Sequence, residues 1–245
     1  MAAIPGRCCN SPAMRDGYDG EALPPRFVEY LAQLRSEVDR PRMNIYPGLT
    51  PQPWHDPGRF RVVAELQRHA PQVIAEAKAL DDCLFQDEAE KIGRVGRWSV
   101  WFLYERGRKN KENCSRCPTT AEVIAADRRV TTSTGMIYFS RLDPNTRIAP
   151  HKGPTNMRLR CHFGIEIPDE CGIRVGGVEA RWEPGRSIVF DDSFEHEAWN
   201  LSDRRRTVLI VDVWHPDLSD DEVLLLDGLQ RYAFGQRPTN YCGTE

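Results

Sequence analysis

Apolar residues recur at helical spacing in the first part of the chain and near its end. The segment FVEYLAQLRSEV after Pro25 places its apolar residues three to four positions apart, which predicts an amphipathic helix. Further helices are predicted over residues 59–69, 71–81, 119–129 and 219–234. Pro71 suits the first turn of its helix, and Ser219 with Glu222 forms a capping box at the start of the last one. Between the first two helices, the proline-rich segment NIYPGLTPQPWHDPG predicts a loop.

Strand patterns dominate the second part of the chain. Strands are predicted over residues 97–107, 135–142, 157–167, 172–182, 186–190 and 206–213. Turn residues separate them at Pro168-Asp-Glu, Gly176-Gly177 and Pro184-Gly185. Many short strands divided by such turns predict a mainly β fold with flanking helices, built on a cupin-like jelly roll, the double-stranded β-helix.

The order of these patterns predicts a flexible leader and one domain. Residues 1–24 are rich in small and turn-forming residues, and residues 25–245 form the expected domain. Within it we expect a helical part at 25–95, a β core at about 97–216 and a C-terminal helix at 219–234. The first residues lack the apolar stretch of a secretion signal, and no apolar run approaches the roughly 18–20 residues of a membrane span. A cytoplasmic location without membrane attachment is therefore expected.

Composition narrows the partners. The chain has 245 residues, of which 40% are hydrophobic and 28% charged, with a formal net charge of −3, so one substantial core is expected and a nucleic-acid partner is not. Its eight cysteines form no repeating framework and are expected to be mostly reduced. Cys114 and Cys117 lie in a basic, polar segment that predicts a loop. Their C-x-x-C spacing is compatible with zinc, a disulfide or free thiols, and free thiols are favoured.

Polar side chains also occur on the predicted strands. Arg158, Arg160 and His162 alternate with apolar residues and therefore share one face of a strand, as in a barrel with a polar lining. His151 and His196 flank strands at the spacing of a jelly-roll metal site. Together these residues indicate a metal site beside an anion site.

The third ligand position argues against the commonest iron site. Non-haem iron(II) oxygenases normally bind their metal through two histidines and one carboxylate, which usually lies two residues after the first histidine. Here that position is Gly153. Asp191 and Asp192 precede His196 closely enough to orient its ring from outside the ligand set. For the remaining histidines a structural role is expected, at positions 55, 69 and 215.

Long motifs add a family resemblance. The block HKGPTNMRLRCHFGIEIP, followed by FDDSFEHEAWN and RTVLIVDVWHPDLS, resembles the aspartyl/asparaginyl β-hydroxylase family of iron(II)- and 2-oxoglutarate-dependent dioxygenases. YPGLTPQPW and WFLYERGRKNKENC extend the resemblance, so that it covers about residues 45–218. Members of this family have glycine where the carboxylate ligand would be, so Gly153 agrees with the resemblance.

The resemblance implies a role for each polar residue of the site. His151 and His196 would bind iron(II), with dioxygen as the second substrate. Arg206, which opens the last strand, would pair with the distal carboxylate of 2-oxoglutarate. A guanidinium suits this role because its planar fork can donate two parallel hydrogen bonds to one carboxylate. Ser140 would donate to the same carboxylate.

The remaining roles concern the other end of the co-substrate and the substrate itself. Arg160 and His162 would lie near the end of 2-oxoglutarate that chelates iron, and Arg158 would bind a substrate carboxylate. The implied reaction hydroxylates an unactivated C–H bond of a small-molecule, amino-acid or peptide substrate, at the β-carbon of an aspartyl or asparaginyl residue or a related position. The alternative is a non-catalytic cupin-like protein that binds a metal or ligand.

Overall fold

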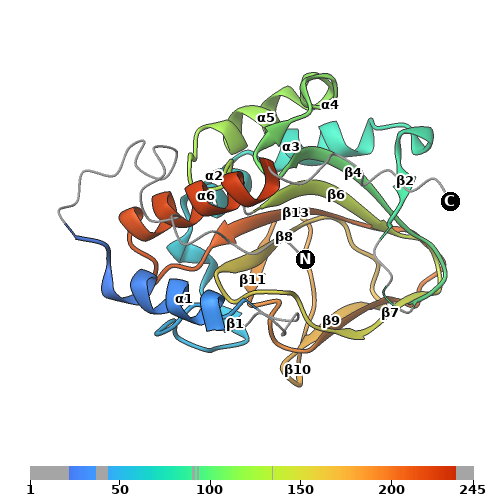
Figure 1. Cartoon of the computed structure of the whole chain (residues 1–245). Helices are drawn as coiled ribbons and strands as arrows, with labels where there is room; N and C mark the ends of the chain where they lie inside the picture. The colour runs from blue at the N-terminus through green and yellow to red at the C-terminus, as the bar shows by residue number, and fades with distance from the viewer. Residues whose placement is uncertain (1–21, 37–43, 90–91, 93, 134, 236–245) are drawn as a thin grey trace, which may run out of the picture.

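Two antiparallel sheets form the framework of the computed structural model, which describes residues 22–36, 44–89, 92, 94–133 and 135–235 (Figure 1). The strands of the major sheet are β1 (Trp54–His55), β2 (Gln86–Asp87), β4 (Trp98–Glu105), β5 (Arg108–Lys109), β6 (Met136–Leu142), β8 (Arg158–Glu166), β11 (Ser187–Phe190) and β13 (Arg206–Trp214). Those of the minor sheet are β3 (Arg94–Val95), β7 (Thr146–His151), β9 (Cys171–Val175), β10 (Val178–Ala180) and β12 (His196–Asn200). The major sheet runs β1-β11-β8-β13-β6-β4-β2 with β5 beside β4, and the minor sheet runs β10-β9-β12-β7-β3. This arrangement confirms the mainly β, jelly-roll fold class.

Alternation along the strands divides the core into two layers. On β13, Leu209 and Val211 pack toward helices on the outer face of the major sheet, whereas Val208 and Ile210 pack into the space between the sheets. The space between the sheets is also where the polar side chains of the candidate site lie, since they occupy the inward positions of the same strands.

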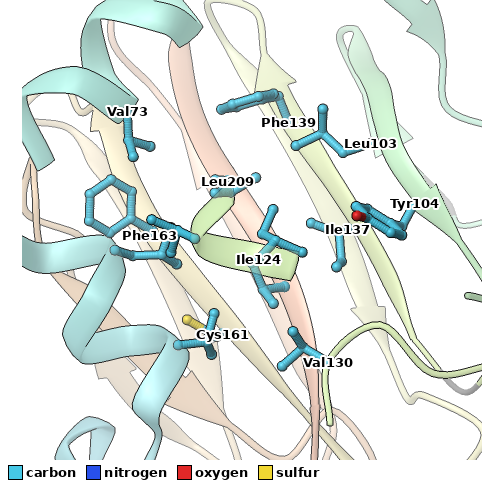
Figure 2. Packing of buried hydrophobic residues seen from close by; sticks show 14 of the residues in the cluster. Val73, Leu103, Tyr104, Ile124, Val130, Ile137, Phe139, Cys161, Phe163 and Leu209 are labelled. Carbon is cyan, nitrogen blue, oxygen red and sulfur yellow. The ribbon is translucent and has the colours of Figure 1, made fainter. Parts of the chain in front are cut away.

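Four helices cover the outer face of the major sheet, namely α2 (Arg61–Arg68), α3 (Ala70–Lys78), α4 (Lys111–Arg116) and α5 (Pro118–Ala125). Helices α1 (Pro25–Ser36) and α6 (Asp220–Gly235) pack in a separate apolar cluster with Tyr46, Met157 and Trp214, and the 3-10 turns are η3 (Pro57–Arg59) and η4 (Asp82–Leu84). Figure 2 shows Val73 and Ile124 from the helices against Phe163 and Leu209 from the sheet. These side chains are all essentially inaccessible to solvent, so the helices stabilise the sheet that positions the site. None of the helices in the described residues combines the length and the apolarity that crossing a bilayer requires.

Several predicted elements differ from the structure. The predicted strand 172–182 is two strands, β9 and β10, because Gly176 and Gly177 both adopt positive φ and reverse the chain between them. The strands β7 and β12 were not predicted as strands. The basic segment expected to be a loop contains helix α4, which begins where the Asn110 side chain accepts a hydrogen bond from the Asn113 N–H at 3.0 Å.

The cysteines of the described residues are free thiols, at positions 83, 114, 117, 161 and 171. Cys114 and Cys117 are both buried, and burial raises the pKa of the Cys117 thiol to about 12. A buried, protonated thiol pair is unreactive, which agrees with the preference for free thiols over zinc or a disulfide. Cys8, Cys9 and Cys242 lie outside the described residues, as does nearly all of the predicted leader.

A buried carboxylate ties the proline-rich loop to the last helix. Glu222 accepts hydrogen bonds from the Tyr46 hydroxyl at 2.8 Å and from Arg26 at 2.6 and 3.0 Å. It also accepts from the Ser219 N–H at 2.9 Å, while the Glu222 N–H donates to the Ser219 hydroxyl at 3.2 Å, which confirms the capping box. The Glu222 side chain thus joins helices α1 and α6 to the proline-rich loop at Tyr46.

Glu222→Ala is expected to lower the free energy of unfolding by about 2–3 kcal/mol, because the Tyr46 hydroxyl and the half-buried Arg26 guanidinium lose their acceptor. Urea denaturation monitored by circular dichroism measures this. The matched control is Glu112→Ala, which removes an exposed carboxylate that pairs with Arg116 on the surface and should change stability by less than about 0.5 kcal/mol. Equal effects of the two substitutions would contradict a stabilising role for Glu222.

Candidate metal and anion site

Two histidines face each other between the sheets. His151 is the last residue of β7 and His196 the first of β12, and the two are direct cross-strand partners. Their ring centroids lie 4.0 Å apart. The sequence placed these histidines beside strands, whereas the structure places them on strands of the minor sheet, which fixes their separation through the register of the pair.

Backbone carbonyls set the orientation of both imidazoles. Nδ1 of His151 donates to the Ala149 carbonyl oxygen and Nδ1 of His196 to the Phe194 carbonyl oxygen, each at 2.9 Å. The proton on Nδ1 leaves the Nε2 lone pair of each ring available to a metal ion. Burial and the neighbouring His151 lower the pKa of His196 to about 4, so that ring is neutral at neutral pH. Two facing imidazoles, each held through Nδ1 by a backbone carbonyl, fit a divalent transition metal.

The Asp192 side chain occupies the space that a side chain at position 153, the usual place of the third metal ligand, would need. A Cβ atom added to Gly153 would lie 2.5 Å from both Cγ and Oδ1 of Asp192. The Gly153 N–H also donates to the Asp192 carbonyl oxygen at 2.6 Å, so the two backbones cannot easily separate. Among the described residues, no group of three or more His, Cys, Asp or Glu side chains is arranged to hold a metal ion.

Gly153→Asp should therefore give no gain in catalysis, and it should lower the thermal unfolding midpoint because the new side chain meets the buried Asp192 carboxylate. Gly153→Ala tests the steric part separately, since it adds only the Cβ atom. Unfolding followed by calorimetry and product formation by mass spectrometry are the two measurements. A Gly153→Asp variant with higher activity than the wild type would show that the native site is a degraded three-ligand site.

Two buried aspartates pair with the two arginines of β8 near the histidines. On β8, Arg160 donates to Asp212 at 3.2 Å, and Arg158 donates to the same carboxylate at 3.1 Å. Asp192 lies 3.5 Å from Arg160 and 3.7 Å from Arg158. Two guanidinium groups thus share two buried carboxylates, and burial without such pairing would be costly. The sequence predicted that Asp191 or Asp192 would orient the His196 ring. In the structure the Phe194 carbonyl oxygen holds Nδ1 of that ring instead.

Asp212 is the residue of this cluster that the sequence analysis missed. Its side chain is fully buried, and it also accepts from the Met136 N–H at 3.0 Å. The available signal was its position as the one charged residue in the apolar run VLIVDVW, because a carboxylate in such a run must be paired when the strand is buried.

Arg206 also lies between the sheets, at the opposite end of β13 from Asp212, and it has no carboxylate partner in the described residues. Its side chain is 2% exposed, and its guanidinium lies 4.7 Å from the centre of the Trp182 ring. One terminal nitrogen donates to the backbone oxygen of Ser140 at 3.3 Å and reaches its hydroxyl at 3.5 Å. Burial lowers the pKa of Arg206 to about 10, so the group is still charged at neutral pH. In the described part of the chain no Asp or Glu lies within ion-pair distance of it, and its buried Nε has no hydrogen-bond partner.

His162 presents a second buried donor. The Trp182 indole N–H donates to His162 Nδ1 at 3.3 Å, and an indole nitrogen can only donate, so the neutral ring has its proton on Nε2. Burial and the nearby Arg206 hold the pKa of His162 well below its usual range, which keeps the ring neutral. The buried Nε2 has no hydrogen-bond partner within the described residues. A donor in this state fits an acceptor supplied by a ligand.

Packed aromatic rings connect the two ends of the site. Trp182 stacks on His162 with ring centroids 6.0 Å apart, and His162 meets Phe190 edge-on at 4.9 Å. Phe190 in turn packs on His196 at 5.6 Å. The structure therefore brings the predicted anion-binding residues and the predicted metal-binding residues together between the sheets, in largely buried surroundings.

The other three histidines lie outside this space and have structural partners, as expected. His69 at the junction of α2 and α3 contacts the Glu65 carbonyl oxygen at 3.0 Å. His215 accepts from the Asp217 N–H at 3.2 Å and contacts the Thr50 carbonyl oxygen at 3.3 Å. His55 packs edge-on against His215 with centroids 5.1 Å apart.

Residues 67–216 match the family described as Aspartyl/Asparaginyl beta-hydroxylase. The chain belongs to this family. It is 39% identical over 183 residues to the human Aspartyl/asparaginyl beta-hydroxylase, an alignment that covers 71% of this chain and 24% of the relative. It is 33% identical over 182 residues to the Ornithine lipid ester-linked acyl 2-hydroxylase of Rhizobium tropici, covering 70% of this chain and 63% of that protein.

Other relatives and one solved structure complete the comparison. The human Aspartate beta-hydroxylase domain-containing protein 2 is 32% identical over 204 residues, which covers 79% of this chain and 55% of the relative. The chain thus spans between about a quarter and two thirds of the length of these curated relatives. A prolyl-4-hydroxylase from Pseudomonas putida aligns with 63% of this chain and 98% of its own at a TM-score of 0.40 and 16% identity.

Proposed function

We propose that the protein is an iron(II)- and 2-oxoglutarate-dependent hydroxylase that acts on an unactivated C–H bond. Membership of the hydroxylase family supports the reaction class. The observation that supports the co-substrate most strongly is the charged, buried Arg206, which has no carboxylate partner in the described residues. Because an uncompensated buried charge is costly, the site is expected to be completed by an anionic ligand.

Each end of 2-oxoglutarate would find a matching group. Arg206 and the Ser140 hydroxyl would hold the distal carboxylate, since Ser140 already accepts from the Trp98 indole at 3.0 Å and can turn its own hydrogen toward a ligand. The His162 Nε2–H and Arg160 would meet the other end, near the histidine pair. The ring contacts from Trp182 to His196 support one ligand that reaches from the arginine to the metal.

His151 and His196 would hold the iron. When bound, iron(II) with 2-oxoglutarate supplies the oxidising power to insert one atom of dioxygen into a C–H bond, with succinate and carbon dioxide as co-products. The protein binds and orients both substrates and excludes water through the buried rings around the site. A third protein ligand is absent from the described residues, so most positions on the metal would be left to the co-substrate and dioxygen.

Arg158 is proposed to meet a carboxylate of the substrate. It is more exposed than Arg160, with 13% against 9% of the side chain accessible, and it lies on the same face of β8 as the metal-proximal groups. Its charge is shared with Asp212 and Asp192, so a substrate carboxylate would join an existing cluster. The target is proposed to be the β-carbon of an aspartyl or asparaginyl residue or of a related amino acid or peptide.

The experiment is a product search with the full chain, iron(II), ascorbate and 2-oxoglutarate. Amino acids and peptides containing aspartate or asparagine are screened by mass spectrometry for the gain of one oxygen atom. We expect a hydroxylated product that disappears when iron is chelated or 2-oxoglutarate is omitted. Binding of iron and 2-oxoglutarate without succinate or any oxidised product would instead indicate a non-catalytic cupin-like binding protein.

A further inference from the structure

A cavity lies directly beside the histidine pair. It has a volume of about 270 Å³, and its lining includes Lys152 and Glu195, the chain neighbours of His151 and His196. Its apolar wall comes from the proline-rich loop and from the segment that leads into β12, through Ile45, Leu49, Pro51 and Phe194. The volume is slightly below the roughly 300–1,000 Å³ of typical small-molecule sites, which fits a group of amino-acid size.

The floor of this cavity contains a buried carboxylate without a counterion. Asp191 is 2% exposed, and one of its carboxylate oxygens accepts from the Ser193 N–H at 2.9 Å. Its own N–H donates to the Pro53 carbonyl oxygen at 3.1 Å, so the residue is held in place from the loop side as well. No Lys, Arg or His of the described residues lies within ion-pair distance of it.

The next residue, Asp192, differs from Asp191 in having positively charged neighbours. Asp192 is equally buried but is 3.5 and 3.7 Å from two guanidinium groups, so its charge is compensated within the protein. Asp191 faces the cavity with burial and the charge of Asp192 both acting against its ionised form, and its carboxyl pKa is raised to about 6. A cation delivered by a ligand would remove this penalty.

We propose that this cavity is the substrate subsite of the hydroxylase proposed above, and that Asp191 selects substrates with a primary ammonium group. An ammonium offers three donors in a compact shape that the small cavity can hold. Lys152 at the exposed rim of the cavity suits the carboxylate of the same molecule, so the lining matches an amino acid with both charges. The inference rests on the proposed function for the reaction, but the binding of the ammonium group does not require turnover.

Equilibrium binding to the full chain without added iron tests this by calorimetry. The probes are L-aspartate, L-asparagine and L-lysine, each with its Nα-acetyl form, which removes the α-ammonium and in lysine leaves the one on the side chain. We expect at least one ammonium-bearing probe to bind, and blocking the ammonium that it uses to weaken binding at least about tenfold. The lysine pair identifies which ammonium is recognised.

Asp191→Asn should cause the same loss, since it keeps the shape of the side chain and removes the charge. Asp169→Asn, an exposed carboxylate in the turn before β9, is the control and should leave binding unchanged. Equal binding of blocked and unblocked probes, no binding of any probe, or unchanged binding by Asp191→Asn would overturn the proposal. The wild-type comparison decides the matter even if Asp191→Asn fails to fold. Ammonium-selective binding without succinate formation would refute only the proposed function, and hydroxylation of blocked substrates alone would refute only this subsite.

Discussion

His151→Ala and His196→Ala are each expected to lower iron-dependent succinate formation by more than about 100-fold, because loss of an outer partner of a metal ligand alone typically costs 10–100-fold. With two histidines as the proposed protein ligands, either substitution removes half of the set. The measurement is succinate formed from 2-oxoglutarate at micromolar iron(II), with iron content determined on the same samples.

A matched histidine provides the control. His69→Ala removes a half-buried imidazole at the junction of α2 and α3, outside the site, and should leave turnover close to that of the wild type. Calorimetric unfolding of all three variants separates loss of metal from loss of fold. If His151→Ala or His196→Ala kept turnover near the wild-type level while folded, the assignment of the metal ligands would be wrong.

Arg206→Ala is expected to raise the dissociation constant for 2-oxoglutarate by about two decades, since a hydrogen bond to a charged group contributes about 1.5–3 kcal/mol and each 1.4 kcal/mol is tenfold. Arg206→Lys keeps the charge without the planar fork, so its dissociation constant for 2-oxoglutarate should fall between those of the wild type and Arg206→Ala. Anaerobic titration of the iron(II)-loaded protein with 2-oxoglutarate measures the constant without turnover.

Two further arginines show whether the effect is specific. Arg205→Ala, on the neighbouring residue that pairs with Asp143 and Asp82 near the surface, should leave the constant unchanged. Arg158→Ala should change it only a few-fold while weakening hydroxylation and uncoupling it from decarboxylation. If Arg158→Ala weakened 2-oxoglutarate binding as much as Arg206→Ala, the proposed division between co-substrate and substrate arginines would be wrong.

Much of the framework could be predicted because the sheet is strongly patterned. Strands β4, β6, β8 and β13 are long and rich in apolar and aromatic residues, so their positions follow from the sequence within a few residues. The short strands β7 and β12 could not be found in this way. Charged and polar residues interrupt both strands, and β7 also contains Pro150, while their pairing with each other depends on contacts between distant parts of the chain.

The types of residue in the site could be predicted from the sequence, but not which charged side chains have a partner of opposite charge. The sequence indicates that His151, His196 and the arginines of β8 share one region, yet it does not distinguish Arg158, which has carboxylate partners, from Arg206, which has none in the described residues. That difference arises from position along β13, because Arg206 and Asp212 lie on the same inward face of the strand but Asp212 is paired with Arg160 near one end and Arg206 lies at the other end. The same holds for Asp191 and Asp192, adjacent aspartates whose environments differ only once the chain is folded.

Isotopically labelled dioxygen tests the central claim most directly. The wild-type protein is supplied with iron(II), 2-oxoglutarate and an amino-acid or peptide substrate found in the product search, and both products are analysed by mass spectrometry. The account predicts one labelled oxygen atom in succinate and one in the hydroxyl group of the product, in equal amounts, with neither formed when iron or 2-oxoglutarate is left out. A product whose hydroxyl oxygen comes from water, or hydroxylation that proceeds without consuming 2-oxoglutarate, would contradict it.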